Sequence, residues 1–134
     1  MNQVFVDTSG WLAIVVASDQ YHSEAVLHYE RFRTEETKLI THEGVLIEVG
    51  NMLSPSRSRS VAVELRTKII ASSRIELAAL TNELIDDAWD LYSKRADKDW
   101  SIVDCMSFLV MERRGIVEAL TDRHFEQAGF TKLL

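Results

Sequence analysis

Short apolar runs alternate with amphipathic stretches along almost the whole chain, and this alternation constrains the fold more than any other feature. We expect strands in four apolar runs: 3–6, 38–41, 75–80 and 116–120. Helical spacing of apolar residues marks the stretches between and after them: 9–17, 23–34, 41–53, 61–72, 82–95 and 101–114. Strands separated by helices favour a parallel sheet with helices on both faces. The sequence therefore predicts an α/β protein, a three-layer α/β/α sandwich with a mostly parallel central sheet.

Local signals place several helix ends. Thr8 or Ser9 is expected to cap the first helix, and Thr41 the third, because their hydroxyls accept hydrogen bonds from free backbone amides. Pro55 ends the third helix, and Gly115 follows the last one at the position where glycine commonly terminates a helix. These signals divide the chain into short elements without a long linker.

Length and composition indicate one compact domain, spanning 1–134. The chain has 134 residues, of which 46% are hydrophobic, enough for a real core. Its longest apolar stretch near the start, 11–17, is far shorter than the roughly 20 residues of a membrane span, so no membrane association is predicted. The single cysteine, Cys105, excludes an intrachain disulfide and is expected to be a buried thiol. These features favour a cytoplasmic protein.

The net charge of −6 and a pI near 5.2 argue against a broad basic surface for nucleic acid. Any contact with nucleic acid must therefore be local. The densest basic stretch contains Arg57 and Arg59 in a serine-rich run. It has two interpretations, a solvated loop that leads into an amphipathic helix, or a rim that contacts phosphates beside an acidic centre.

Four acids lie against or inside apolar runs. They are Asp7, Glu48, Asp104 and Asp122. A carboxylate in or near a core costs several kcal/mol or more unless a positive or hydrogen-bonding group meets it. Asp7 and Asp122 directly follow predicted strands, at the edge where parallel sheets hold their ligands. The set suggests a shared cation and a metal-dependent hydrolase.

Each acid also has a structural explanation of some strength. Asp7 is suited to turning a strand into a helix, and Asp122 to capping a short helix near 123–127. Asp104 completes an approximate capping box at the start of its helix. Glu48 is the hardest to explain structurally, because its neighbours at helical spacing are apolar and no basic residue stands three or four positions away.

Four segments around these acids resemble the PIN-domain nucleases. They are V-F-V-D-T-S-G-W-L-A at 4–13, L-I-E-V-G-N around Glu48, W-S-I-V-D-C-M-S-F around Asp104 and A-L-T-D-R-H-F around Asp122. Each segment alone is weakly specific, whereas the set in this order is fairly specific. Size and motif order resemble the VapC-type toxins of type II toxin–antitoxin pairs, from residue 4 to about residue 130.

The resemblance implies a PIN-like fold and an endoribonuclease that uses Mg²⁺ or Mn²⁺. The four acids would be its metal-binding and catalytic residues, and Thr8, Ser9 and Thr121 would be supporting polar groups near the pocket. Hard oxygen ligands select Mg²⁺ or Mn²⁺ over Zn²⁺, and a bound ion activates water and neutralises phosphate charge.

The resemblance also implies three partners: an RNA substrate, a cognate antitoxin protein and a second copy of the chain. Arg123, with Arg57 and Arg59, is a candidate for RNA contact. Apolar residues that hint at a homodimer surface are Trp11, Leu12, Tyr29 and Phe32, all equally suited to the core.

Other assignments have less support in the residues. His124 is expected to be an exposed residue of a first helical turn. Trp11 and Trp100 are expected to be core or subunit-contact residues, and Asp97 and Asp99 are expected to form an acidic loop. A haloacid-dehalogenase-like phosphatase would need a second Asp where Ser9 stands, and no glycine-rich nucleotide-binding motif occurs. The alternative that stays open is a non-catalytic PIN-like domain that binds protein or RNA.

Overall fold

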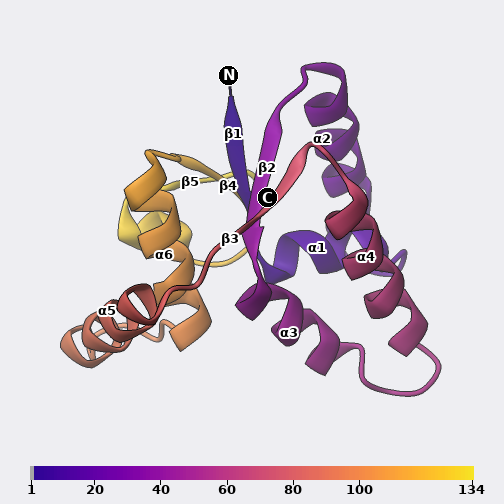
Figure 1. Ribbon diagram of the computed structural model, residues 1–134. Coiled ribbons are helices and arrows are strands. Elements are labelled where there is room, and N and C mark those ends of the chain that lie inside the picture. Colours follow the sequence, from indigo (N-terminus) through magenta and orange to yellow (C-terminus); the bar gives the residue numbers. More distant parts are fainter. Residues whose placement is uncertain (1) are drawn as a thin grey trace.

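The structure is a computed structural model that describes residues 2–134 (Figure 1). Its strands are β1 (Gln3–Val6), β2 (Lys38–His42), β3 (Ile75–Ala78), β4 (Glu118–Leu120) and β5 (Thr131–Lys132). Its helices are α1 (Thr8–Val15), α2 (His22–Thr34), α3 (Glu43–Met52), α4 (Arg59–Ala71), α5 (Asn82–Lys94) and α6 (Ile102–Arg114), with a short 3₁₀ helix η1 (Phe125–Ala128).

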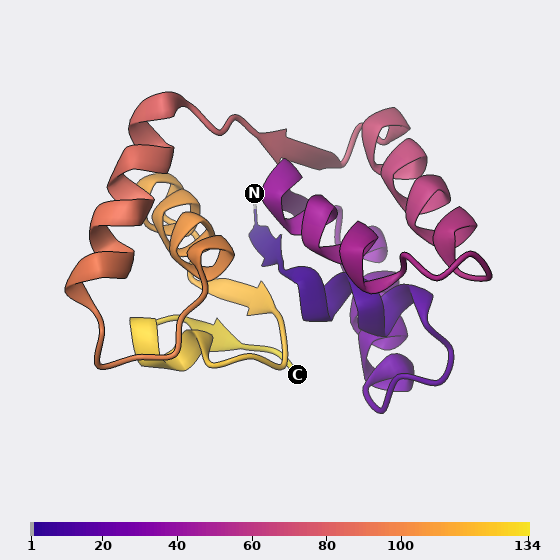
Figure 2. The ribbon, with the colours of Figure 1, turned by 90° about the horizontal axis from the view of Figure 1, so that it is seen from below.

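All the strands within residues 2–134 pair in parallel, in the order β3-β2-β1-β4-β5. Phe5 of β1 is in register with Ile40 on one side and with Ala119 on the other. Helices α1 to α4 lie on one side of the sheet, and α5 and α6 lie on the other (Figures 1 and 2). The predicted α/β/α sandwich with a parallel central sheet is confirmed.

The strand order places a switch point between β1 and β4. The chain runs outward from β1 to β2 and β3, and then returns to add β4 and β5 on the other side of β1. In open parallel sheets, ligands bind where the order reverses, beyond the carboxyl ends of the strands. Asp7 follows β1 and Thr121 follows β4 at this edge, which faces the viewer in Figure 2.

The core forms where apolar strand residues meet the helices on both faces. Val4, Phe5 and Val6 are at most 2% exposed, a burial that parallel strands covered on both faces require. Phe108 of α6 packs against Phe125 with ring centroids 4.8 Å apart. Each such buried side chain stabilises the fold by roughly 1.5–3 kcal/mol. The strand ends that carry polar residues are therefore anchored in a rigid centre.

Helix starts follow the predicted chemistry at α6 but not at α1 or α3. The prediction that Thr8 or Ser9 caps α1 is wrong, because Asp7 occupies the N-cap position and makes no side-chain cap bond. Ser101 and Asp104 form a reciprocal capping box at α6. At α3 the prediction that Thr41 is the cap is wrong, because the side chain of His42 accepts the Val45 amide instead. Thr41 is a buried strand residue whose hydroxyl donates to the Val6 carbonyl at 3.0 Å.

Gly10 lets α1 approach β4 closely. A Cβ built on Gly10 would lie 2.1 Å from the Leu120 carbonyl oxygen, a distance that no side chain tolerates. The first turn of α1 therefore rests against the end of β4, and Ser9 comes within reach of the residues that follow Leu120. This contact brings two motifs more than 100 positions apart to one edge.

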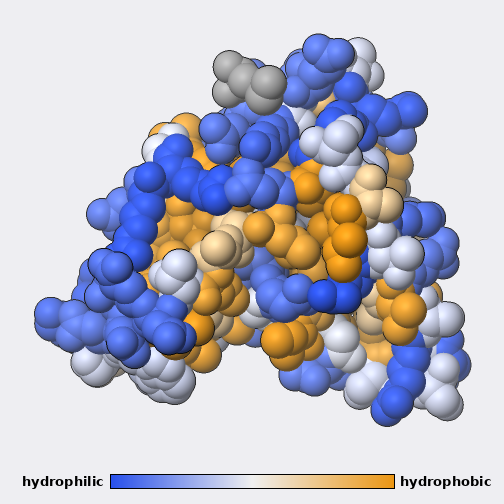
Figure 3. Space-filling model, in the orientation of Figure 1, coloured by the Kyte–Doolittle hydropathy of each residue, from blue (hydrophilic) through white to orange (hydrophobic). Residues whose placement is uncertain are grey.

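Apolar side chains also reach the surface on the face that carries β3 (Figure 3). A cavity of about 390 Å³ beside this edge strand has Ile69, Ile70 and Leu77 in its lining. Large side chains more than half exposed include Ile47 and Val63 on α3 and α4. Across residues 2–134, no helix combines the length and apolar character that crossing a membrane requires.

Candidate active site

Asp7 is at the centre of the site, immediately after β1 and only 1% exposed. Its Oδ2 accepts a hydrogen bond from the Thr121 hydroxyl at 3.2 Å. Its Oδ1 has no hydrogen-bond partner among residues 2–134, and neither has the buried hydroxyl of Thr8. Asp7 occupies the N-cap position of α1 without making a side-chain cap bond, so the capping explanation does not account for its burial.

A chain of hydroxyl groups fixes the Asp7 carboxyl group. Ser9 Oγ and Thr121 Oγ1 lie 3.1 Å apart, and Thr121 Oγ1 accepts the Arg123 amide at 3.0 Å. Because the Thr121 proton is given to Asp7, Ser9 is the donor in the Ser9–Thr121 bond. Ser9 in turn accepts the Asp122 amide at 3.0 Å. The predicted supporting residues Ser9 and Thr121 therefore connect the ends of β1 and β4.

Asp104 is held at the N-terminus of α6, where it is 2% exposed. Its Oδ2 accepts the Ser101 amide at 2.9 Å and the His124 Nε2–H at 3.2 Å. Arg123 Nη2 is 3.5 Å from the same oxygen. The capping box is thus real, but it does not exhaust the role of Asp104, whose carboxylate also faces the loop after β4.

The contact with His124 corrects one expectation. His124 is not an exposed residue of a helical turn, because its side chain is only 25% exposed and its ring bonds to Asp104. The sequence held no local signal for this pair, since 20 positions separate the two residues. His124 and Arg123 place two nitrogen donors beside one active-site carboxylate.

Glu48 and Asp122 complete the acidic edge. Glu48 is half-buried on α3, and Asp122 is half-buried directly after Thr121. The expected helix after Asp122 is only the short η1, whose N-cap position is His124, so Asp122 does not cap it. The negative charges of both Glu48 and Asp104 act on Asp7. The structure thus brings three acids into one electrostatic neighbourhood.

The pKa of Asp7 is raised from 3.8 to about 7, chiefly by burial, and the charges of Asp104 and Glu48 contribute to this rise. The nearby Thr8 amide and the hydrogen bond from the Thr121 hydroxyl oppose this rise in pKa. A carboxyl group that titrates near neutrality, without a basic partner of its own, is a mark of a functional site. Desolvation is the largest cause, and the nearby acids add to it.

The donor set fits a hard divalent cation. Carboxylate oxygens dominate it, and the unpartnered Asp7 Oδ1 and Thr8 hydroxyl are buried oxygen atoms that an ion can satisfy. Among residues 2–134, however, no three His, Cys, Asp or Glu side chains stand close enough together to hold one ion in this arrangement. Asp104 and Glu48 therefore interact electrostatically with Asp7, but the three side chains are not arranged as a ready-made set of metal ligands.

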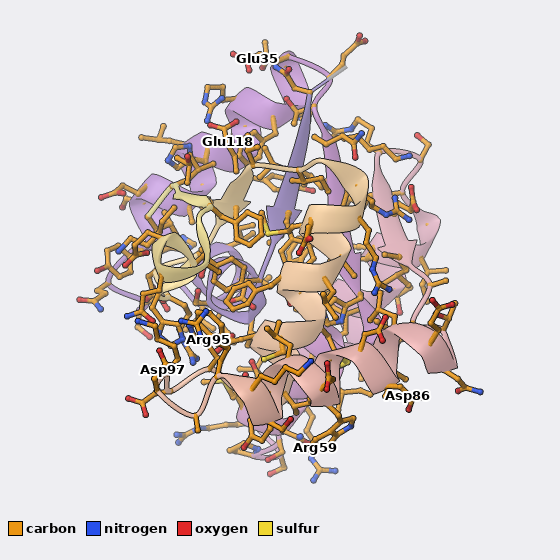
Figure 4. All side chains as sticks on the ribbon, turned by 90° about the vertical axis from the view of Figure 1, so that its left-hand side faces the viewer. Glu35, Arg59, Asp86, Arg95, Asp97 and Glu118 are labelled. Atoms are coloured by element: carbon orange, nitrogen blue, oxygen red, sulfur yellow. The ribbon has the colours of Figure 1, made fainter. Side chains whose placement is uncertain are left out.

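The remaining candidates lie around this edge. Arg57 is exposed in the segment between α3 and α4. Arg59 is exposed as the first residue of α4, and its Nε donates to the Ser54 carbonyl. Figure 4 places Arg59 at the lower end of the molecule, toward which β1 runs. Asp97 forms an ion pair with Arg95 on the outside of the fold.

The residues expected in the core are found there. Cys105 is fully buried, and burial raises the pKa of its thiol to about 11, so it is not a nucleophile. Trp11 and Trp100 are 1% and 6% exposed, and Phe32 is 1% exposed. Trp11 and Phe32 therefore belong to the core of this chain and present no surface for a second copy.

Comparisons with known proteins give one consistent result. The model of the PIN domain family matches residues 4–131. The 23S rRNA-specific endonuclease VapC20 of Mycobacterium tuberculosis is 30% identical over 131 residues, which cover 97% of each chain, in both strains compared. The crystal structure of M. tuberculosis VapC20, described as a sarcin–ricin loop cleaving toxin, superposes with a TM-score of 0.83 at 28% identity over 96% of each chain.

The family match, the near-complete coverage and the shared fold confirm the resemblance inferred from the four motifs. The chain therefore belongs to the PIN domain family and is a VapC-like PIN nuclease.

Proposed function

We propose that this chain is an Mg²⁺- or Mn²⁺-dependent endoribonuclease that acts as the toxin of a toxin–antitoxin pair. The observation that carries the proposal is the buried Asp7 at the switch point, with one carboxyl oxygen unpartnered among residues 2–134 and two further acids acting on it. Family membership supports the ribonuclease toxin and leaves the non-catalytic alternative without support.

In this proposal Asp7, Glu48, Asp104 and Asp122 hold the metal ion. When bound, the ion activates water and offsets the negative charge of a phosphodiester. The hydroxyl chain from Ser9 through Thr121 keeps Asp7 oriented, and the capping box keeps Asp104 oriented.

Arg123 contributes positive charge at the site. Its guanidinium group is 41% exposed beside Asp104, where it can meet a phosphate of the substrate. Arg57 and Arg59 extend this contact as a local basic rim. An acidic protein can therefore act on an anionic substrate, because a metal ion and a few arginines supply the positive charge where RNA binds.

We propose ribosomal RNA as the substrate class. The VapC20 relatives are described as 23S rRNA-specific, and the match covers almost the whole chain. The test is to incubate the purified protein with intact ribosomes, isolated 23S rRNA and tRNA, with Mg²⁺, Mn²⁺ or EDTA. We expect a discrete 23S fragment only with metal.

Two variants make the test specific. Asp7→Asn and Glu48→Gln should each abolish fragment formation while the protein remains folded by circular dichroism. Asp97→Asn, which changes an exposed acid outside the site, is the matched control and should cleave normally. Cleavage by Asp7→Asn at the wild-type rate, or undiminished cleavage in EDTA, would refute the proposal.

We further propose that the protein is cytoplasmic, binds a cognate antitoxin and forms a homodimer. Ile47, Met52 and Val63 support a partner surface, because these large apolar side chains are at least 60% exposed on α3, which carries Glu48, and on the next helix, α4. We expect the antitoxin to be a small protein encoded beside the gene, and co-expression with it should yield a stable complex without nuclease activity. Light scattering of the free protein at micromolar concentration should give twice the chain mass, and a single-chain mass would contradict the dimer.

A further inference from the structure

A fully buried histidine joins two helices of the site. His42 has 0% exposure and lies at the junction of β2 and α3. Its Nδ1 accepts the Val45 amide at 3.2 Å, and its Nε2 is 2.9 Å from the hydroxyl oxygen of Ser107 in α6. The ring therefore bridges 65 positions of sequence between α3 and α6.

The hydrogen bonds assign one tautomer to His42. Because Nδ1 accepts a backbone amide, its lone pair is in use, and the ring proton of the neutral imidazole must be on Nε2. Nε2–H then donates to Ser107, whose own hydroxyl donates to the Val103 carbonyl at 2.9 Å. The hydrogen bonds therefore run in one direction, from His42 through Ser107 to the Val103 carbonyl, and both ring nitrogens of His42 have a hydrogen-bond partner.

The bridge lies one helical turn from each of two acids. Glu48 is three residues after Val45 on α3, and Asp104 is three residues before Ser107 on α6. Residues three apart share a face of a helix, so Asp104 lies on the face of α6 that carries Ser107. Glu48 lies one turn beyond the backbone amide of α3 that His42 caps. The electrostatic action of both acids on Asp7 agrees with this placement.

The surroundings hold the ring in place. A Cβ on Gly44 would lie 3.0 Å from ring atoms of His42 and 3.0 Å from Met106 Cε, so glycine leaves the space that the ring fills. The ring also packs near Phe5, at 5.7 Å between centroids. Rotation of the imidazole out of the bridge is therefore blocked on several sides.

We infer that His42 is a positioning residue, which sets the separation of Glu48 on α3 and Asp104 on α6 and thereby the affinity of the site for a divalent cation. The inference rests on the proposed metal-dependent function. His42 itself does not contact substrate or metal, since it is buried between the helices.

Two substitutions break the bridge from opposite ends. His42→Asn retains a good N-cap acceptor for the Val45 amide but is too short to reach Ser107. Ser107→Ala retains the histidine and the cap but removes the acceptor of the Nε2–H. Outer-shell hydrogen bonds typically change metal affinity by about 10- to 100-fold. We expect each variant to weaken Mn²⁺ binding about tenfold, and the double variant to weaken it no further, because both remove the same link.

The experiment measures the Mn²⁺ dissociation constant of the full chain by electron paramagnetic resonance, and the tautomer by ¹⁵N chemical shifts of the His42 ring. Ile69→Ala, in the core of α4, is the control for general destabilisation and should leave the dissociation constant within about twofold of wild type. If Ser107→Ala does not fold, Ser107→Cys offers a weaker acceptor of similar size.

The outcomes separate this inference from the proposed function. Wild-type protein that binds no Mn²⁺ would overturn the metal-dependent function and the positioning role with it. Wild-type binding that is unchanged in both bridge variants, a loss equal to that of Ile69→Ala, or a His42 ring protonated on Nδ1 would overturn the positioning role alone.

Discussion

Asp7 should destabilise the metal-free protein at neutral and alkaline pH. Its pKa rises from 3.8 to about 7 on folding, chiefly because of burial. At roughly 1.4 kcal/mol per pH unit, this rise corresponds to about 4 kcal/mol. Between pH 3.8 and about pH 7 the folded chain binds more protons than the unfolded chain, so the free energy of unfolding falls as the pH rises through this range. The loss is complete above about pH 7 and absent below about pH 4.

Asp7→Asn removes this penalty and keeps a carbonyl oxygen for the Thr121 hydroxyl. We therefore expect the variant to be more stable than wild type at pH 8 without metal, with about 4 kcal/mol as the upper limit and a Tm at least about 5 °C higher. The advantage should shrink toward zero near pH 4. Burial lowers the pKa of His42 to about 4, so protonation of His42 destabilises the fold as the pH falls. This effect is the same in wild type and in Asp7→Asn, and it therefore cancels in the difference between their unfolding free energies.

The assay is urea unfolding of both proteins in EDTA at pH 4, 6 and 8, followed by tryptophan fluorescence. A variant less stable than wild type at pH 8, or a difference that stays constant across the three pH values, would refute the argument. At pH 8, saturating Mn²⁺ should make wild type more stable than Asp7→Asn, because the ion stabilises only the protein that retains the carboxylate.

Three further predictions follow from the same geometry. Mn²⁺ binding should release a proton, so affinity should rise about tenfold per unit between pH 5 and 7 and level off above pH 7, as calorimetry in two buffers can verify. Gly10→Ala should lower stability by more than about 3 kcal/mol in the same urea assay, because its Cβ would collide with the Leu120 carbonyl. Gly50→Ala should raise stability by about 0.5–1 kcal/mol, because, apart from its chain neighbours and the adjacent backbone of its own helix, no atom of residues 2–134 lies within 4 Å of the added Cβ. Thr121→Val should remove the bond that lowers the pKa of Asp7 and reduce RNA cleavage at pH 7 by about tenfold, with partial recovery at pH 9; equal loss at both pH values would contradict this role.

The alternation of apolar runs and helices predicted most of the fold because it reflects burial on both faces of a parallel sheet. The strands at residues 3–6 and 38–41 were placed to within one residue. The edge strand Thr131–Lys132 was missed, since it is two residues long and carries no apolar run. The cap of α3 was missed because histidine rarely caps a helix, and its position is fixed by Ser107, which is distant in sequence.

The sequence singled out residues that the structure brings to one edge of the sheet, but it did not predict the contacts between them. Asp7 and Asp122 could be placed by topology, because both follow parallel strands. The bond between His124 and Asp104 depends on how α6 packs beside β4, which no local pattern encodes. Asp104 carried two explanations in the sequence, a cap and a site residue. The structure confirms the cap and places His124 and Arg123 beside the same carboxylate.

The most direct test of the central claim is a crystal structure of the protein grown with Mn²⁺, with the anomalous signal of the metal measured. We predict a peak about 2.0–2.3 Å from Asp7 Oδ1, with Asp104 or Glu48 as a second ligand. A peak bound elsewhere, or none at Asp7 in protein that still cleaves RNA, would contradict it.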